Sequence, residues 1–139
     1  MAEAALSNLR PPLHLDVDDR SWDAVADRIF HAVVSINMIH IAPWEACQGL
    51  MAGAARVLRS DGVLYLYGPF MIGCRHTAPS NAAFDGSLKA MDQRFGIRDV
   101  AAVSAEAALN GLTLEKQVSM PANNFSLIFR RQAATQGVR

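Results

Sequence analysis

Asn37 and His40 are the residues whose types and spacing first indicate chemistry in this sequence. They interrupt the end of an apolar run, VVSINMIHIAPW, which covers residues 33–44. An amide can both donate and accept hydrogen bonds, and a neutral imidazole can take up a proton near neutral pH. Polar side chains at the end of a buried strand are placed where α/β proteins bind ligands. We therefore expect Asn37 to orient a substrate and His40 to act as a general base. The alternatives are that Asn37 only satisfies backbone groups at the strand end and that His40 is a packed or surface residue.

Three aromatic residues near the ends of predicted elements are further candidates. Trp44 follows Pro43 at the start of a predicted helix, and Tyr67 and Phe70 lie at the end of the strand predicted over residues 63–70. Aromatic rings can line a small-molecule site, and a tyrosine hydroxyl can also form a hydrogen bond. Trp44 is equally explained by packing at the start of its helix, so both interpretations of it stay open.

The elements that position these residues alternate between strands and helices. Residues 13–17 predict a short strand, and the β-branched run over residues 31–41 predicts a strand covered on both faces. The further expected elements are a helix that starts at Pro43, has Arg59 in its last turn and is stopped by Gly62, a strand over 63–70, helices over about 82–94 and 99–110, and strands over 112–120 and 125–131. The last two strands form an antiparallel hairpin. The expected fold is therefore α/β, with a mostly parallel sheet and a C-terminal antiparallel hairpin.

The composition excludes several classes of protein. The 139 residues are 51% hydrophobic and 19% charged, which is typical of a globular domain rather than a disordered chain. The 13 basic and 13 acidic side chains cancel, and no basic stripe indicates nucleic acid or a membrane as partner. No apolar run approaches the roughly 20 residues of a membrane span. Two cysteines without a secretory signal favour a cytoplasmic protein, and the histidines lack the spacing of a metal site.

Several short words of the sequence resemble the DUF938, or methyltransferase-like 26, family. They are NMIHIAPW, YGPF, TAPSNAAFD and MPANN, and the resemblance spans residues 1–131, with a polar tail over 132–139. The helix containing RVLRSDG, the strand after it and the final hairpin also resemble the Rossmann-like class I methyltransferase fold. The resemblance implies a partial methyltransferase-like domain that uses S-adenosylmethionine to methylate an unknown small molecule.

The resemblance also implies where the cofactor and the methyl acceptor lie. It implies cofactor contacts at Asp16, Val17, Asn37 and Met38, with Asp16 accepting a hydrogen bond from the adenine amine. Asp16 is equally explained as a strand-end cap or a solvated turn. The resemblance also favours acceptor contacts at His40 and Asn123, and the candidate acceptor contacts are in all His40, Trp44, Tyr67, Phe70, Asn81 and Asn123. Asn81 is equally explained as a helix cap, and Asn123 as an ordinary turn residue.

One departure from the family fold is large. Class I methyltransferases hold their cofactor with a glycine-rich loop after the first strand, whereas no G-x-G occurs in this sequence. When these short sequence motifs are aligned with the family, residues 13–17 correspond to the third strand of that fold. We therefore expect the first two strands to be absent. The strand over 33–41 would then be an exposed apolar edge, which is liable to pair with another chain.

Three explanations of this departure stay open. The chain starts late, with Met1 an internal methionine; it is a natural fragment; or two copies pair through the exposed edge as a homodimer. The corresponding functions are a methyltransferase or a non-enzymatic module that dimerises or binds a partner through that edge. Another nucleotide-binding enzyme, such as a dehydrogenase, is disfavoured because G-x-G-x-x-G is absent.

Overall fold

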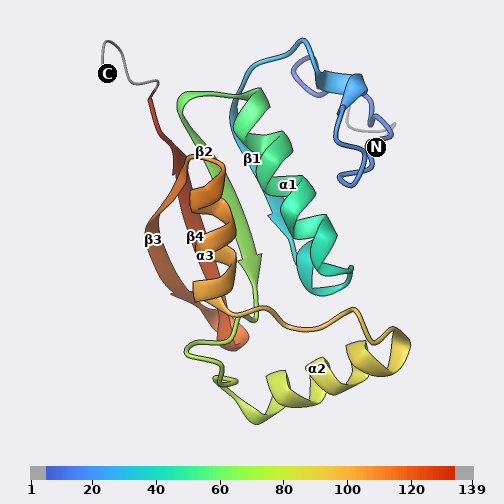
Figure 1. Cartoon of the computed structure of the whole chain (residues 1–139), viewed down its shortest axis with the longest axis vertical. Coiled ribbons are helices and arrows are strands. Elements are labelled where there is room, and N and C mark those ends of the chain that lie inside the picture. The colour runs from blue at the N-terminus through green and yellow to red at the C-terminus, as the bar shows by residue number, and fades with distance from the viewer. Residues whose placement is uncertain (1–5, 134–139) are drawn as a thin grey trace.

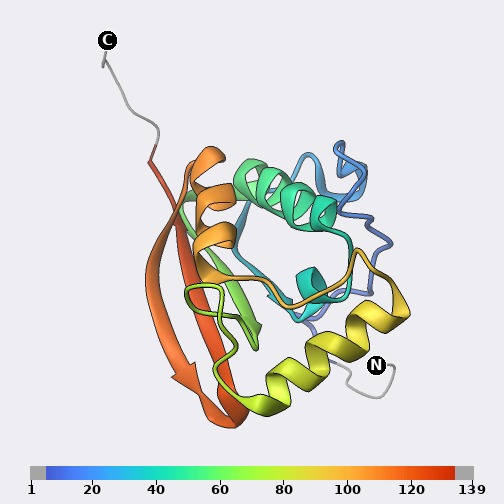
Figure 2. The same ribbon diagram turned by 60° about the horizontal axis from the view of Figure 1, so that its bottom comes forward.

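The structure is a computed structural model that describes residues 6–133, so most of the polar tail predicted over 132–139 lies outside the described residues. Its strands are β1 (Phe30–Ile36), β2 (Leu58–Gly68), β3 (Leu112–Met120) and β4 (Asn124–Arg131), and its helices are α1 (Trp44–Val57), α2 (Pro79–Met91) and α3 (Val100–Leu109). Short 3-10 turns cover Asp23–Val25, Met38–His40 and Pro121–Asn123. Helices α1 and α3 lie against the sheet, and α2 crosses the end where β2 finishes (Figures 1 and 2).

The four strands form one mixed sheet in the order β1-β2-β4-β3. Strand β1 is parallel to β2, whereas β4 is antiparallel to both of its neighbours, β2 and β3. The predicted C-terminal hairpin is therefore confirmed. The prediction of a mostly parallel sheet was wrong, because β4, the second strand of the hairpin, lies beside β2. It forms two antiparallel strand pairings, with β2 and with β3, against the one parallel pairing of β1 with β2.

Residues 13–17 do not form the predicted strand. Within the described part of the chain, no strand lies beside this segment to supply a hydrogen-bonding ladder, so it packs on α1 instead. The Val17 carbonyl oxygen lies only 2.1 Å from the position that a Cβ would take on Gly49. The Trp22 ring covers Gly53 in the same way, and the Trp22 indole N–H donates to the Val17 carbonyl at 3.3 Å. Two glycines one turn apart thus form the groove that receives this segment.

Strand β1 is shorter than predicted and is covered on one face only. It ends at Ile36 because Asn37 adopts a left-handed conformation with φ of 63°, which breaks the extended backbone. Val34 and Ile36 are 60% and 59% exposed, so the prediction of a strand covered on both faces was wrong. The prediction of an exposed apolar edge is confirmed for the described residues, since β1 is the terminal strand of the sheet.

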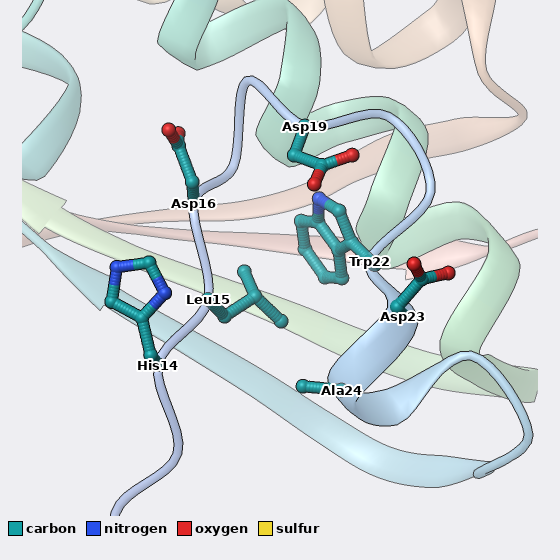
Figure 3. Close-up of a pocket in the computed structure, with 7 residues that line it drawn as sticks. All are labelled: His14, Leu15, Asp16, Asp19, Trp22, Asp23 and Ala24. Atoms are coloured by element: carbon teal, nitrogen blue, oxygen red, sulfur yellow. The ribbon is translucent and has the colours of Figure 1, made fainter.

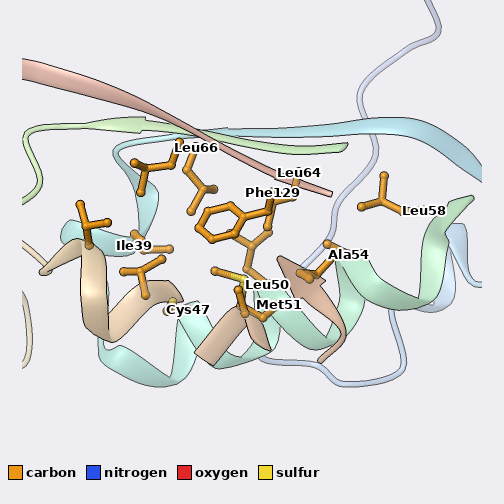
Figure 4. Packing of buried hydrophobic residues seen from close by; sticks show 14 of the residues in the cluster. Ile39, Cys47, Leu50, Met51, Ala54, Leu58, Leu64, Leu66 and Phe129 are labelled. Carbon is orange, nitrogen blue, oxygen red and sulfur yellow. The ribbon is translucent and has the colours of Figure 1, made fainter. Parts of the chain in front are cut away.

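The core lies between the sheet and the helices α1 and α3 (Figure 4). Leu64 and Leu66 of β2 point into it and meet Phe129 of β4, while Leu50 and Met51 approach from α1. Each such fully buried side chain contributes about 1.5–3 kcal/mol relative to an exposed one. None of the helices in the described range has the length and apolar character needed to span a bilayer.

Candidate functional site

The carboxyl ends of β1 and β2 form a tight polar corner around Gly68. The Asn37 backbone N–H donates to the Tyr67 carbonyl at 2.9 Å, which joins the two strand ends. The following 3-10 turn brings His40 against Gly68, so that its Nε2 lies 2.5 Å from the position a Cβ would take there. The Asn37 Oδ1 lies 3.1 Å from the same position. Any side chain at position 68 would therefore displace the imidazole.

His40 is completely buried and held on two sides. Its Nδ1 accepts a hydrogen bond from the Arg98 backbone N–H at 3.0 Å. Its ring lies edge-on to Phe70, with 4.7 Å between the ring centroids and 70° between the planes. Burial, and secondly the Arg98 charge, lower the pKa of His40 to about 4, so the imidazole is neutral near pH 7.

Arg98 is a positioning residue that the sequence did not reveal. Its guanidinium donates to the carbonyls of Ile39 at 3.0 Å and Ala42 at 2.8 Å, and lies 5.5 Å from the centre of the Trp44 ring. These contacts hold the segment between β1 and α1 in place. A single arginine ahead of a helix gives no sequence signal, because its carbonyl partners lie more than fifty positions away.

Asp85, in the middle of α2, is the centre of a second polar cluster. Its Oδ2 accepts from Lys89 at 3.0 Å and lies 3.2 Å from His76 Nε2, while its Oδ1 accepts from the Ile97 backbone N–H at 2.8 Å. Burial raises the pKa of Asp85, but these hydrogen bonds outweigh it and the pKa is lowered overall. The carboxylate thereby fixes the backbone that leads to Arg98.

The predicted residues Asn81 and Asn123 meet each other. The Asn81 side-chain amide is buried and donates to the Asn123 backbone carbonyl at 3.1 Å and to Thr77 Oγ1 at 3.3 Å. This contact ties α2 to the turn of the C-terminal hairpin. The Asn123 side chain is itself exposed, and its backbone is left-handed with φ of 60°.

The other predicted acceptor residues are divided between two faces of the sheet. Phe70 touches His40, and Trp44 lies under Arg98, so both are next to the corner. Tyr67 follows Leu66 and precedes Gly68, both of which face the core, so the alternation of β2 directs Tyr67 to the opposite face. The structure therefore does not bring the Tyr67 ring together with His40.

The predicted cofactor residues also lie apart from each other. Asn37 and Met38 belong to the corner, whereas Asp16 lines a separate pocket in the N-terminal segment (Figure 3). Val17 is half-buried against α1. The Asp16 carboxylate accepts a hydrogen bond from the Asp18 backbone N–H at 2.9 Å, as in an ordinary turn.

Two side-chain atoms of the corner are buried without a partner. Among the described residues, Asn37 Oδ1 and His40 Nε2 are each closed off from solvent and make no hydrogen bond. An orphaned buried polar atom costs about 1–3 kcal/mol, and a bound ligand is one way to supply the missing partner. No group of three or more metal-ligating side chains occurs between residues 6 and 133.

A family model covers most of the sequence. The model described as "Protein of unknown function (DUF938)" matches residues 1–131. The chain belongs to the DUF938 family. This finding confirms the resemblance that the words NMIHIAPW, YGPF, TAPSNAAFD and MPANN indicated.

Solved structures share the fold of this DUF938 protein at low sequence identity. An O-methyltransferase family protein from Burkholderia thailandensis is 16% identical with a TM-score of 0.73, over 88% of this chain and 36% of its own. LaPhzM is 12% identical with a TM-score of 0.74, over 94% and 37% of the two chains. CalO1, a methyltransferase in calicheamicin biosynthesis solved with S-adenosylhomocysteine (SAH), is 14% identical with a TM-score of 0.61, over 76% and 32%. The DUF938 chain thus spans about a third of the length of these proteins.

The described residues of the DUF938 chain fit S-adenosylmethionine only in part. The orphaned atoms of Asn37 and His40 suit a polar ligand at the strand ends. The pocket beside Asp16 has a volume of about 110 Å³, below the roughly 300–1,000 Å³ of typical small-molecule sites. Residues 6–133 therefore do not enclose a whole cofactor beside Asp16.

Proposed function

We propose that this chain carries the acceptor side of an S-adenosylmethionine-dependent methyltransferase that acts on a small molecule. The observation that supports the proposal most directly is the corner at the carboxyl ends of β1 and β2. There a buried amide and a buried imidazole each leave one polar atom without a partner, on the fold shared with O-methyltransferases. Ligands of α/β sheets bind beyond the carboxyl ends of the strands.

The proposed roles follow the positions of the side chains. S-adenosylmethionine supplies an electrophilic methyl group when it is bound. Asn37 and His40 orient the acceptor, and Phe70 and Trp44 exclude water around them. Asn81 and Asn123 join α2 to the hairpin turn and give the acceptor site its outer wall. Alignment of the acceptor with the methyl group contributes much of the rate of such a displacement.

Thermal unfolding of the full chain with and without SAH tests the cofactor part of the proposal. A ligand that binds only the folded state at 100 times its Kd stabilises it by about 2.7 kcal/mol, which is roughly 10 °C in Tm for a chain of this size. We expect an upward shift that grows with the concentration of SAH. No shift at millimolar concentration would reject cofactor binding by this chain.

Asp16→Asn tests whether the adenine lies beside Asp16, as the family resemblance implies. The matched control is Asp18→Asn, two residues further along the same turn, where only the backbone N–H contributes to the hydrogen bond with Asp16. The proposal expects the first variant to lose most of the SAH shift and the second to keep it. Equal shifts in both variants would place the adenine elsewhere.

A second candidate function is assembly of two copies through β1. This terminal strand carries no Asp, Glu, Lys or Arg from Phe30 to Ile36, so two antiparallel copies would bring no like charges together. The exposed side chains Val34 and Ile36 would be covered by such pairing. The absence of charge on an apolar edge is what favours this alternative.

Sedimentation of the full chain tests this assembly. Val34→Lys places a charge on β1, and Val118→Lys, on the terminal strand β3 at the other side of the sheet, is the matched control. Assembly through β1 predicts a dimer that the first variant dissociates and the second retains. Assembly through β1 would be rejected if the wild type stays a monomer when its concentration is raised 100-fold. It would also be rejected if both variants had the same effect.

A further inference from the structure

Three consecutive backbone N–H groups connect helix α2 to His40. The N–H groups of Gly96 and Arg98 both donate to His40, the first to its carbonyl oxygen at 2.9 Å and the second to Nδ1 of its ring at 3.0 Å. The N–H of Ile97, between them, donates instead to Oδ1 of Asp85 at 2.8 Å. The segment that these three residues form therefore runs between α2 and the turn that carries His40 (Figure 2).

The imidazole of His40 depends on this segment for its one hydrogen bond. Among the described residues, Nδ1 accepts from the Arg98 N–H and Nε2 has no partner. A backbone N–H can only donate, so the bond also makes Nδ1 the unprotonated nitrogen of the neutral ring. The orientation of the ring therefore depends on where the backbone of Arg98 lies.

The buried carboxylate of Asp85 is explained by the backbone N–H that it accepts. Asp85 is 7% exposed, and burial opposes the charge of its carboxylate. The contact with Lys89 does not account for this position, because the Lys89 side chain is 58% exposed and such surface pairs contribute little. Oδ2 accepts from Lys89 and lies 3.2 Å from His76 Nε2, which leaves Oδ1 for Ile97. A charge-assisted bond of this kind is about twice as strong as one between neutral groups.

Gly96 allows α2 to approach the segment this closely. A Cβ on Gly96 would lie 3.1 Å from Oδ1 of Asp85 and 3.1 Å from Cε of Lys89, so a side chain there would press on both. The buried residues of α2 are Asn81, Asp85 and Leu88. The Asn81 amide donates to the turn of the C-terminal hairpin and to the loop before α2. Asp85 is therefore the buried polar side chain by which α2 holds the segment.

We infer that Asp85 is a positioning residue for His40, because its carboxylate fixes the backbone of residues 96–98, whose outer two N–H groups hold the carbonyl and the ring of His40. Asp85 acts through this backbone and makes no hydrogen bond to the imidazole. The docking of α2 and the orientation of the ring are thereby coupled. The role of His40 toward a methyl acceptor rests on the proposed function, whereas its positioning by Asp85 does not.

Nuclear magnetic resonance of the full ¹⁵N-labelled chain, without any ligand, tests this positioning. The two nitrogens of an N–H···N hydrogen bond are coupled through the bond, so a coupling between the Arg98 amide and Nδ1 of His40 reports directly on their contact. We expect this coupling in the wild type and its loss in Asp85→Ala. It should be retained in Asp85→Asn, because the amide oxygen can still accept from Ile97. A wild type that lacks the coupling would overturn the inference, whether or not the alanine variant folds.

Leu88→Ala is the matched control for a purely structural role of α2. It removes packing from the same buried face of the helix and leaves the carboxylate in place. We expect this variant to be less stable and to keep the coupling. Equal loss in Leu88→Ala and Asp85→Ala, loss in Asp85→Asn, or an unchanged coupling in Asp85→Ala would each refute positioning by the Asp85 acceptor. Asp85→Leu, which also offers no acceptor, replaces an alanine variant that does not fold. These spectra do not depend on SAH, so absence of SAH binding would reject the proposed cofactor alone.

Discussion

The buried imidazole of His40 makes a definite prediction about stability in mild acid. Its pKa is about 4 in the folded chain, against an ordinary value of 6.5. As the pH falls below 6.5, the unfolded chain binds a proton at this position that the folded chain does not bind. The stability contributed by the neutral ring is therefore present above pH 6.5 and is lost as the pH falls toward 4.

The size of the effect follows from the two pKa values. Linkage gives a loss of about 1.3 kcal/mol in the free energy of unfolding between pH 7.5 and pH 5.5, and about 2.5 kcal/mol by pH 4.5. The first interval is the more informative one. The carboxylates Asp85 and Asp92 have lowered pKa values, so they stay ionised between pH 7.5 and pH 5.5.

Urea denaturation of the wild type and of His40→Gln at both pH values isolates this contribution. Glutamine removes the titratable ring, while the remaining histidines stay in both proteins and cancel in the comparison. We expect the wild type to lose about 1.3 kcal/mol more than the variant between pH 7.5 and pH 5.5. Identical pH dependence in the two proteins would show that His40 is not held neutral by burial, and the reasoning would fail.

Three substitutions and two control variants, Gly86→Ala and Arg94→Ala, test the packing of the site and of the N-terminal segment. Gly68→Ala places a methyl group 2.5 Å from an imidazole nitrogen and should destabilise the chain by about 1–3 kcal/mol in urea melts. In Gly53→Ala the new methyl group would meet the Trp22 indole ring at 2.0 Å, so the variant should have a lower Tm. In Gly86→Ala nothing lies within 4 Å of the new methyl group, so this variant should be more stable by about 0.5–1 kcal/mol. Equal effects of the two variants would contradict the docking of the N-terminal segment. Arg98→Ala removes charge-assisted bonds to two loop carbonyls and should cost about 2–4 kcal/mol, against less than about 1 kcal/mol for the exposed Arg94→Ala.

The elements defined by local pattern could be predicted from the sequence. The helix after Pro43 was predicted because its apolar residues recur at helical spacing, and the C-terminal hairpin because a short link joins two alternating runs. The strand predicted over residues 13–17 failed because a strand needs a neighbour, which is a long-range condition. The end of β1 was misplaced because the apolar run continues through a left-handed Asn37.

The candidate site could be predicted only in part for the same reason. Asn37, His40 and Phe70 were found because they lie close in sequence to two strand ends that meet. Arg98 was missed, because its hydrogen bond to Nδ1 of His40 joins residues that are far apart in the chain. That one backbone N–H changes the chemistry of the imidazole, and no pattern of residue types carries such information.

The glycine groove of α1 has a consequence for how the molecule opens. The segment around Val17 and Trp22 is held by shape against Gly49 and Gly53, and no strand pairing ties it to the sheet. Its release would break few hydrogen bonds, whereas unfolding of β2 and β4 disrupts the whole ladder. We therefore expect the segment to undock at a lower free energy than the sheet unfolds, so that its amide hydrogens exchange with solvent before those of the sheet. We expect the two tryptophans to report on different events, because Trp22 packs on Gly53 and Trp44 packs on Arg98, which holds the loop that carries His40.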